Sequence, residues 1–207
     1  MYSDMRIKNS EIKNSQVVIR AMTREDIEAV LEIERASVSD PWSHDAFHAT
    51  LLLPYAHYYV AEIVPQVVAE TTALQKAADS AVSAEKKIDK ESEGTTETDK
   101  TADAADHPHI IAECGVRDIM GEGEITNVAV HPDFRGKGIA RQMMKHVLHE
   151  SLAKGITSFT LEVRAGNRAA IALYERFGFR TEGVRREFYE DPVENALIMW
   201  LRQESSV

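Results

Sequence analysis

The chain has 207 residues, of which 34 are acidic and 24 are Lys or Arg, so its formal net charge at pH 7 is −10. This length is enough to bury the core of one α/β domain and little more. An acidic chain binds nucleic acid poorly, because backbone phosphates attract clustered Lys and Arg. We therefore expect a basic partner and no direct contact with nucleic acid.

The cysteine content and the hydropathy indicate the cellular compartment of the protein. Cys114 is the only cysteine, which excludes an intramolecular disulfide and suits a reducing compartment. Residues 1–16 lack the apolar stretch of a secretory signal. The most apolar neighbourhood, 51–69, is interrupted by Pro54 and Glu62 and is too polar to cross a bilayer. We expect a cytoplasmic protein that does not span a membrane.

The first part of the chain predicts two strands and two helices behind a polar extension. Residues 1–16 are polar, and we expect them to be flexible. Apolar residues at 17–22 and 57–64 are typical of strands. Between these strands, helical spacing of apolar residues predicts a helix over 23–37, and Ser43 can cap a short helix that ends near residue 52.

Residues 66–107 differ from the rest of the chain in composition. They include no Phe, Tyr or Trp, and they carry ten acidic residues against five lysines, which is half of the net charge. Such a segment has too little apolar surface to offset the entropy of ordering. We expect an acidic, low-complexity insertion within a single domain that covers residues 17–202. Docking to a partner is the alternative role for this segment.

The remaining chain alternates further strands with two amphipathic helices. The helix predicted at 136–155 carries its apolar residues on one stripe, and Asn167 can cap a second helix that ends at Gly178. Residues 203–207 form a tail. Strands are predicted at 109–116, 122–132, 156–164, 179–189 and 196–201. The order of elements predicts an α/β (α+β) fold, with helices on the faces of a mixed sheet.

A glycine-rich turn stands where the long helix begins. Arg135, Lys137 and Arg141 alternate there with Gly136 and Gly138. A helix N-terminus exposes unpaired N–H groups that favour an anion, and glycine lets the backbone approach it. The turn fits a phosphate-binding site, and a tight turn with solubilising charges is an equal alternative. Neither the Walker loop nor the dinucleotide pattern fits, because each needs a glycine that is absent here.

Several stretches of the chain carry a family pattern: RGKGIA (135–140), EITNVAVHPDFRGKGIA (124–140), LEVRAGNRAAIALYERFGF (161–179) and ENALIM (194–199). They resemble the GNAT family of N-acetyltransferases, in particular its RimI-type branch, the ribosomal-protein alanine N-acetyltransferases. The resemblance covers roughly residues 17–64 and 109–202. It implies a mixed, mostly antiparallel central sheet, splayed between the fourth and fifth strands, with acetyl-CoA as co-substrate and no metal.

The resemblance also implies which residues bind acetyl-CoA. Backbone amides of the turn would bind the pyrophosphate. Main-chain groups of the preceding strand would bind the pantetheine arm, and one of its amides would polarise the thioester carbonyl. The residues assigned to the cofactor are Val128, Ala129, Val130, Arg135, Gly136, Lys137, Gly138, Ile139, Ala140, Arg141 and Asn167.

Acetyl transfer to an amine needs a base, because an α-amino group is largely protonated at neutral pH. Glu162 lies within a strand, on the face opposite Leu161 and Val163. A carboxylate in a sheet is costly unless it faces a cleft or a partner. The resemblance makes Glu162 the general base, acting directly or through water. The alternative is an ion pair with Arg164 or another cation.

The departing thiolate needs a proton, and a phenol can donate one while staying protonated at rest. Tyr174 lies in the helix capped by Asn167. The resemblance makes Tyr174 the general acid. The alternative is an ordinary aromatic side chain that packs beside Ile171 and Phe177.

Two further features suggest other chemistry. His44 and His48 have the spacing of zinc ligands, but no third ligand is evident, so we expect no metal site. Cys114 could carry the acetyl group, but a small core residue is favoured.

The expected reaction is direct transfer of acetyl from acetyl-CoA to the N-terminal alanine of a small-subunit ribosomal protein. The insertion, Phe188 and Asn195 depart from the usual pattern of the branch, which weakens the choice of acceptor. One alternative is a GNAT acetyltransferase for protein lysine or a small amine. The other is a non-catalytic CoA- or nucleotide-binding module, against which the presence of both Glu162 and Tyr174 argues.

Overall fold

The computed structural model describes residues 15–39, 41–65 and 109–202. Contacts divide the chain into two units, residues 17–64 with 109–207 and residues 1–16 with 65–108. The second unit lies almost wholly outside the described residues. The predicted extension at 1–16, insertion at 66–107 and tail at 203–207 also lie outside them, so this division of the chain stays a prediction.

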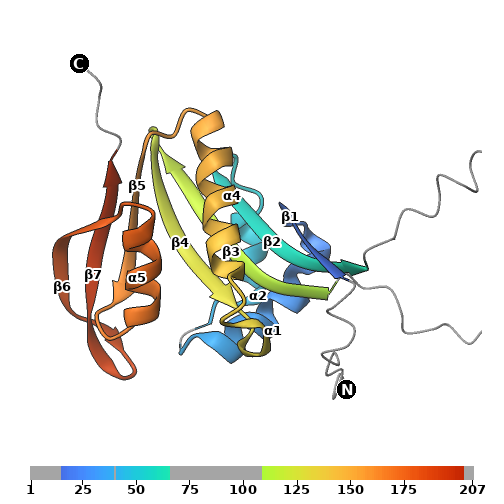
Figure 1. The fold of residues 1–207 in the computed structure, drawn as a ribbon, viewed down its shortest axis with the longest axis horizontal. Helices are drawn as coiled ribbons and strands as arrows, with labels where there is room; N and C mark the ends of the chain where they lie inside the picture. The colour runs from blue at the N-terminus through green and yellow to red at the C-terminus, as the bar shows by residue number, and fades with distance from the viewer. Residues whose placement is uncertain (1–14, 40, 66–108, 203–207) are drawn as a thin grey trace, which may run out of the picture. The chain divides into compact units, whose positions relative to one another are not determined.

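Seven strands of the described chain form one sheet in the order β1-β2-β3-β4-β5-β7-β6 (Figure 1). β4 and β5 pair in parallel, whereas the other pairings with a defined register are antiparallel. This confirms the prediction of a mixed, mostly antiparallel sheet. The strands are β1 (Ser15–Ala21), β2 (Ala56–Pro65), β3 (His109–Ile119), β4 (Glu122–Val130), β5 (Ser158–Arg164), β6 (Arg180–Glu190) and β7 (Val193–Arg202).

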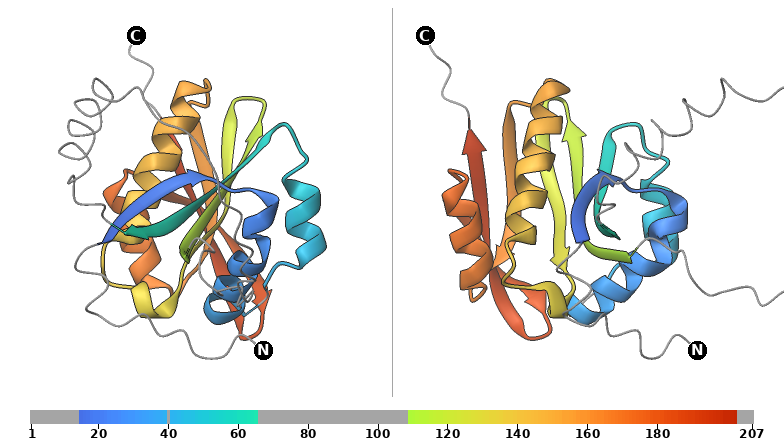
Figure 2. Two further views of the ribbon diagram at one scale, coloured as in Figure 1. Left: turned by 90° about the vertical axis from the view of Figure 1, so that its right-hand side faces the viewer. Right: turned by 45° about the vertical axis from the view of Figure 1, so that its right-hand side comes forward.

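Helices cover both faces of this sheet. α1 (Ile27–Ser37) and α2 (His44–Thr50) lie on one face, and α4 (Ile139–Ala153) and α5 (Arg168–Arg176) lie on the other (Figures 1 and 2). Within the described ranges no helix is long and apolar enough to cross a membrane. The predicted order of strands and helices is confirmed.

Local chemistry explains the ends of several elements. Ser43 caps α2, because its Oγ accepts a hydrogen bond from the N–H of Ala46 at 3.2 Å. The first helix begins with a 3₁₀ turn, Arg24–Asp26, before α1. The strand predicted to run to residue 132 ends earlier, at Val130. Pro132–Phe134 forms a 3₁₀ turn instead, since proline has no N–H to donate to a strand ladder.

The parallel pair diverges halfway along its length. β4 and β5 are paired from Glu122 and Ser158 to Ile125 and Leu161, and beyond that point both strands continue without pairing to each other. The divergence begins at a β-bulge on β4, where Thr126 is an extra residue against β3. A bulge bends its strand and increases its twist. The predicted splay between the fourth and fifth strands is therefore confirmed.

Side chains from β2 and β4 hold the bulge in place. The Tyr58 hydroxyl is 2.8 Å from Thr126 Oγ1, which donates to Asn127 Oδ1 at 2.8 Å. Gly115 of β3 lies directly below, and a Cβ added there would come within 2.6 Å of Asn127 Oδ1. The surrounding core contains Met22, Ile27, Val30, Leu31, Ile33, Phe47, Tyr58, Val60, Ile110 and Ala129.

Candidate active site

The glycine turn before α4 presents bare main chain to the outside. Gly136 and Gly138 have φ angles of 74° and 77°, in the left-handed region that favours glycine. A Cβ added at either position would meet nothing within 4 Å, so the space above the turn is open. Their N–H groups make no hydrogen bond within the described chain. The first N–H groups of any α-helix lack intrahelical partners, so the start of α4 and the turn together offer a cluster of donors.

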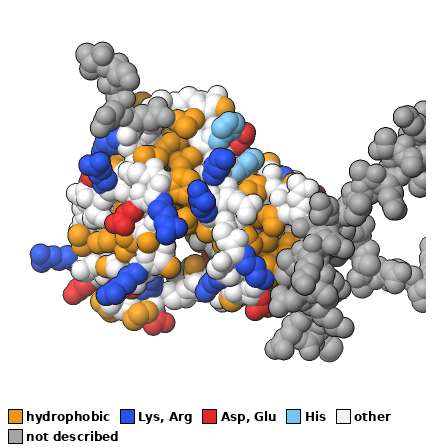
Figure 3. Space-filling model, in the orientation of Figure 1, with side chains coloured by type: hydrophobic (Ala, Val, Ile, Leu, Met, Phe, Trp, Pro, Cys, Tyr) orange, Lys and Arg blue, Asp and Glu red, His pale blue; other side chains and the backbone are white. Residues whose placement is uncertain are grey.

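Basic side chains surround this turn, and two of them brace it. Arg135 Nε donates to the Val130 carbonyl at 3.0 Å. Lys137 Nζ donates to the Asp133 carbonyl at 3.1 Å and lies 4.9 Å from the centre of the Phe134 ring. Figure 3 shows Lys and Arg side chains spread over the face that carries α4 and α5. These side chains place positive charge at the turn in a chain that is acidic overall, and binding of a phosphate there stays a prediction.

The end of β4 offers further main-chain groups. The N–H of His131 donates to the Ile111 carbonyl of β3 at 2.9 Å. Because main-chain groups alternate along a strand, the N–H groups of Val128 and Val130 point to the opposite edge, toward β5. No strand pairs with β4 there. The main-chain groups of Ala129 point toward β3, so its assignment to the cofactor stays a prediction.

Glu162 lies on β5 beyond the point of divergence. Its neighbours Leu161 and Val163 are buried, whereas the Glu162 side chain is 31% exposed, as the predicted alternation requires. Its Oε1 is 2.8 Å from Nη1 of Arg185 on β6. The alternative role expected for Glu162 is an ion pair with Arg164 or another cation, and the cation that it contacts is Arg185. An ion pair with arginine is compatible with a base, because a base must be ionised to accept a proton.

Tyr174 lies on the inner side of α5. Its side chain is buried and its ring centre is 5.9 Å from that of Phe179. Burial raises the pKa of the Tyr174 phenol, and the neighbouring Cys114, Tyr189 and Glu113 raise it further. The phenol is therefore protonated throughout the physiological range.

Asn167 begins α5 and fixes the start of the helix that carries Tyr174. Its Oδ1 accepts a hydrogen bond from the N–H of Ala170 at 3.2 Å, which confirms the predicted cap. The side chain is at the exposed end of the helix. Its contact with the cofactor stays a prediction.

Arg164 connects three segments near Glu162. Its guanidinium donates to a side chain of the α1–α2 connection and to carbonyls and a carboxylate of the β6–β7 hairpin, and it stacks on an aromatic ring at 4.1 Å. These partners are Ser39 (2.7 Å), Asp191 (2.9 Å), Pro192 (3.1 Å), Glu194 (3.3 Å) and the Tyr189 ring. Arginine suits this place because its five donors diverge in a plane. Sequence reasoning missed this role of Arg164, although the residue lies in the stretch 161–179 that carries the family pattern.

The structure brings most of the predicted site residues to one region. Tyr174 and Cys114 are close enough for the thiol to affect the phenol, and Cys114 is paired with Val128 across β3 and β4. Tyr189 lies near both residues, because the charge of Glu162 raises the pKa of Tyr189 and Tyr189 raises the pKa of Tyr174. The proposed base and acid thus flank the divergence of β4 and β5.

The sequence also drew attention to a histidine pair, His44 and His48, and to the thiol of Cys114. His44 and His48 stack with ring centres 6.3 Å apart, and the described residues include no cluster of three metal-ligating side chains. Cys114 is completely buried, and burial raises the pKa of its thiol, which disfavours the reactive thiolate.

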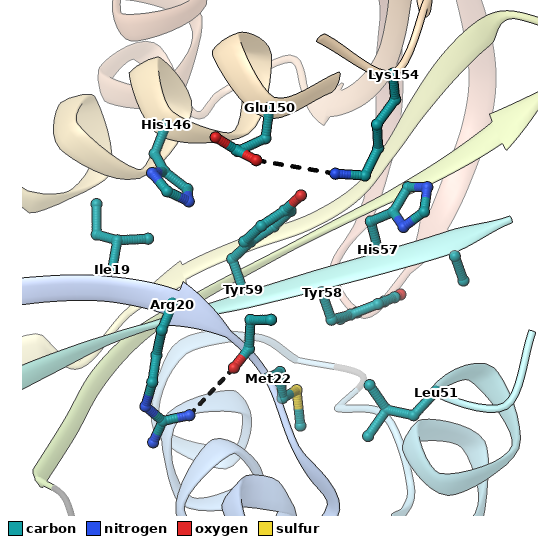
Figure 4. Close-up of a pocket in the computed structure, with 12 residues that line it drawn as sticks. Ile19, Arg20, Met22, Leu51, His57, Tyr58, Tyr59, His146, Glu150 and Lys154 are labelled. Carbon is teal, nitrogen blue, oxygen red and sulfur yellow. Dashed lines mark hydrogen bonds and ion pairs between the residues drawn. The ribbon is translucent and has the colours of Figure 1, made fainter. Parts of the chain in front are cut away.

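A separate pocket of about 530 Å³ lies between β1, β2 and the C-terminal half of α4. Figure 4 shows Tyr59 extending from β2 toward Glu150 of α4 and Lys154, the residue that follows the helix, and these two side chains pair with each other at 3.9 Å. None of the sequence-predicted site residues lines this pocket. One residue of its lining, Tyr58, also contacts the bulge through its hydroxyl.

Comparisons with known proteins bear on this arrangement. The family model described as "Acetyltransferase (GNAT) family" matches residues 78–179. A Bacillus subtilis (strain 168) protein named "putative ribosomal protein bS18-alanine N-acetyltransferase" is 30% identical over 188 residues, which cover 90% of this chain and 96% of that protein. The Escherichia coli (strain K12) ribosomal protein bS18-alanine N-acetyltransferase is 41% identical over 85 residues, or 40% of this chain and 57% of that protein.

The fold has a solved counterpart. The crystal structure of the ribosomal-protein-S18-alanine N-acetyltransferase from Escherichia coli superposes with a TM-score of 0.64 at 24% identity, covering 92% of this chain and 97% of that one. The two chains share the fold. Because the Bacillus relative aligns with nearly the whole of both chains, this chain belongs to the GNAT family of acetyltransferases and is an acyltransferase.

Proposed function

We propose that the protein transfers acetyl directly from acetyl-CoA to the N-terminal alanine of a small-subunit ribosomal protein. The observation that carries the proposal is the presence of N–H groups without a partner in the described chain at two places, the 135–140 turn and the edge of β4 at Val128 and Val130. The turn suits a diphosphate, and the strand edge suits an extended amide-containing arm. A thioester at the end of that arm reaches the region of Glu162 and Tyr174.

The residues of the site divide the chemistry between them. Glu162 accepts the proton of the incoming amine, directly or through water. The N–H of Val128 or Val130 stabilises negative charge on the carbonyl oxygen. Tyr174 donates a proton to the departing thiolate. Arg135, Lys137 and Arg141 add positive charge where the phosphates would lie. No step requires a covalent intermediate on Cys114.

The choice of acceptor rests on the names of the relatives and on charge. The relatives from Bacillus and Escherichia are named for acetylation of alanine on ribosomal protein bS18. A net charge of −10 favours encounter with a basic protein. Asn195, one of the departures from the branch, accepts a hydrogen bond from the N–H of Glu187 at 2.9 Å through Oδ1, a contact that an aspartate could make equally well. A lysine or small-amine acceptor is the competing choice.

Acceptor choice is tested with labelled acetyl-CoA and three amines at equal concentration. We expect acetylation of a basic peptide that begins with alanine, and little of the same peptide blocked at its N-terminus but carrying an internal lysine, or of a polyamine. Mass spectrometry of the products locates the acetyl group. Preferential modification of the lysine or the polyamine would overturn the acceptor and leave the GNAT assignment intact.

Gly138→Val should abolish binding of CoA, because a branched side chain fills the open space above the turn and strains a residue at φ 77°. The measurement is the rise in Tm on adding CoA at about 100 times its Kd, which should be about 5–10 °C for a chain of this size. Gly155→Val is the matched control, since Gly155 has φ 90° and equal space but lies at the other end of α4. Equal CoA stabilisation of both variants would contradict the assigned turn.

Glu162→Gln should lower kcat by about 10²–10⁴-fold at neutral pH, because an amide cannot accept the proton of the amine. The KM for acetyl-CoA should not change. Glu182→Gln is the control, since Glu182 forms a similar exposed ion pair, with Arg202 at 3.0 Å, on β6. Steady-state assays of both variants test the base, and a Glu162→Gln enzyme with full kcat would rule it out.

Tyr174→Phe should also lower kcat by about 10²-fold or more while the ring still packs on Phe179. Because the folded phenol has a raised pKa, ionisation of Tyr174 should cause no loss of wild-type activity up to at least pH 10. Tyr59→Phe, at a buried tyrosine outside the site, is the control. A rate profile that collapses near pH 9 in the wild type and not in Tyr174→Phe would contradict the assignment.

A further inference from the structure

Two carboxyl groups meet in the core between α1 and β3. Glu34 and Glu113 are 1% and 0% exposed. Their outer oxygens are satisfied: Glu34 Oε2 accepts from the N–H of Trp42 at 3.0 Å, and Glu113 Oε2 accepts from Asn127 Nδ2 at 2.7 Å. Their Oε1 atoms are buried and have no hydrogen-bond partner in the described chain. The two carboxyl groups are close enough for Glu34 to raise the pKa of Glu113.

A single proton resolves this arrangement. Two ionised carboxylates in contact within a core repel each other, and each leaves an oxygen without a donor. One shared proton supplies the donor that both Oε1 atoms lack. Burial, together with the charge of Glu34, raises the pKa of Glu113 well above its ordinary value. Retention of a proton by Glu113 therefore keeps the two carboxyl groups from both being ionised.

The pair stands in the middle of a hydrogen-bonded series. On one side Glu34 holds Trp42, which belongs to the α1–α2 connection, the same segment whose Ser39 is bound by Arg164. On the other side Glu113 holds Asn127, and through it Thr126 and the bulge. The series thus links a segment beside Glu162 and Arg164 to the strand whose free N–H groups face the cofactor.

Other titratable groups surround the pair on every side. Tyr58 faces it from β2, Cys114 adjoins it on β3, and Tyr174 approaches from α5; each has its pKa raised in part by the charge of Glu113. β4 contributes the neutral Asn127, and α1 contributes Glu34. No cation of the described chain forms an ion pair with either carboxyl group.

We propose that Glu34 and Glu113 form a proton-sharing positioning pair that fixes the bulge of β4 relative to the α1–α2 connection, and thereby sets the distance between the acceptor and the thioester. The inference rests on the proposed function, because it assigns the pair a role at that same site. Neither residue contacts the reacting atoms, so both act through Asn127 and Trp42.

Replacement by glutamine tests the sharing of a proton. In Glu113→Gln the amide oxygen can accept from Asn127 while its NH₂ donates to Glu34, and in Glu34→Gln the roles are reversed. Each single variant therefore leaves no oxygen of the pair without a donor. In the double variant both outer positions still need an oxygen, so two NH₂ groups face each other and find no acceptor.

We expect each single variant to keep the wild-type Tm within about 2 °C and the double variant to lose about 5 °C or more beyond their sum. The wild type should lose stability relative to Glu113→Gln as the pH rises above about 4.5, because the folded pair retains a proton that the unfolded chain releases. The infrared band of a protonated carboxyl group, present at pH 7, should be absent from Glu113→Gln. The double variant should lose about tenfold in kcat/KM for the acceptor peptide and keep its KM for acetyl-CoA.

Glu32→Gln, at an exposed position on the same helix, is the control. Additive effects of the two glutamines, single variants that fail to fold, or a wild-type Tm that follows the pH as Glu113→Gln does would each overturn the shared proton. A double variant with unchanged peptide kcat/KM would overturn the positioning role. Thermal and infrared measurements need no acetyl transfer, so failure of the proposed reaction with every amine is a separate result.

Discussion

The site depends on the divergence of β4 and β5 at Thr126. Up to Ile125 the main-chain groups of the two strands pair with each other. Beyond Ile125, the edge of β4 that faces β5 has no strand paired with it. Unpaired main-chain groups are tolerated only where water or a ligand reaches them. A polar, extended arm that enters the gap replaces the missing strand, and the helix that follows β4 places its N-terminus where such an arm would end in phosphates. One extra residue in a strand therefore opens the gap in which we propose that the arm of the cofactor binds.

Arginine holds the rest of the site against this strand pair. Arg164 joins the α1–α2 connection to the β6–β7 hairpin, and Arg185 joins β6 to Glu162. Each of these contacts is partly exposed, so each contributes little to stability alone. Their value is geometric, because a planar guanidinium with several partners fixes the directions of the segments that it touches. Two arginines thus fix the segments around Glu162, the residue that we propose as the base.

Local patterns in the sequence predicted the elements well, whereas contacts between distant segments could not be predicted. The alternation around Glu162, the cap at Asn167 and the glycines of the turn are properties of neighbouring residues, and each was confirmed. The bulge at Thr126 depends on Tyr58, which is 68 residues away, and no local pattern reveals it. The partner of Glu162 depends on the register of β6 against β7. Glu113 did carry a signal, since a carboxylate within the apolar strand HIIAECGV requires a partner.

A raised pKa makes Tyr174 a weaker acid, which opposes its proposed role as the proton donor to the thiolate. The environment that raises it acts equally on the group that must receive the proton. Cys114, a thiol in the same core, has its pKa raised by burial and by Glu113, as Tyr174 does. A thiolate released beside Tyr174 would be desolvated in the same way, so its affinity for a proton rises together with that of the phenolate. Proton transfer is governed by the difference between the pKa values of the phenol and the thiol. This difference thus changes much less than either pKa does. The proton donor and the proton acceptor therefore remain matched, because burial disfavours both anions at once.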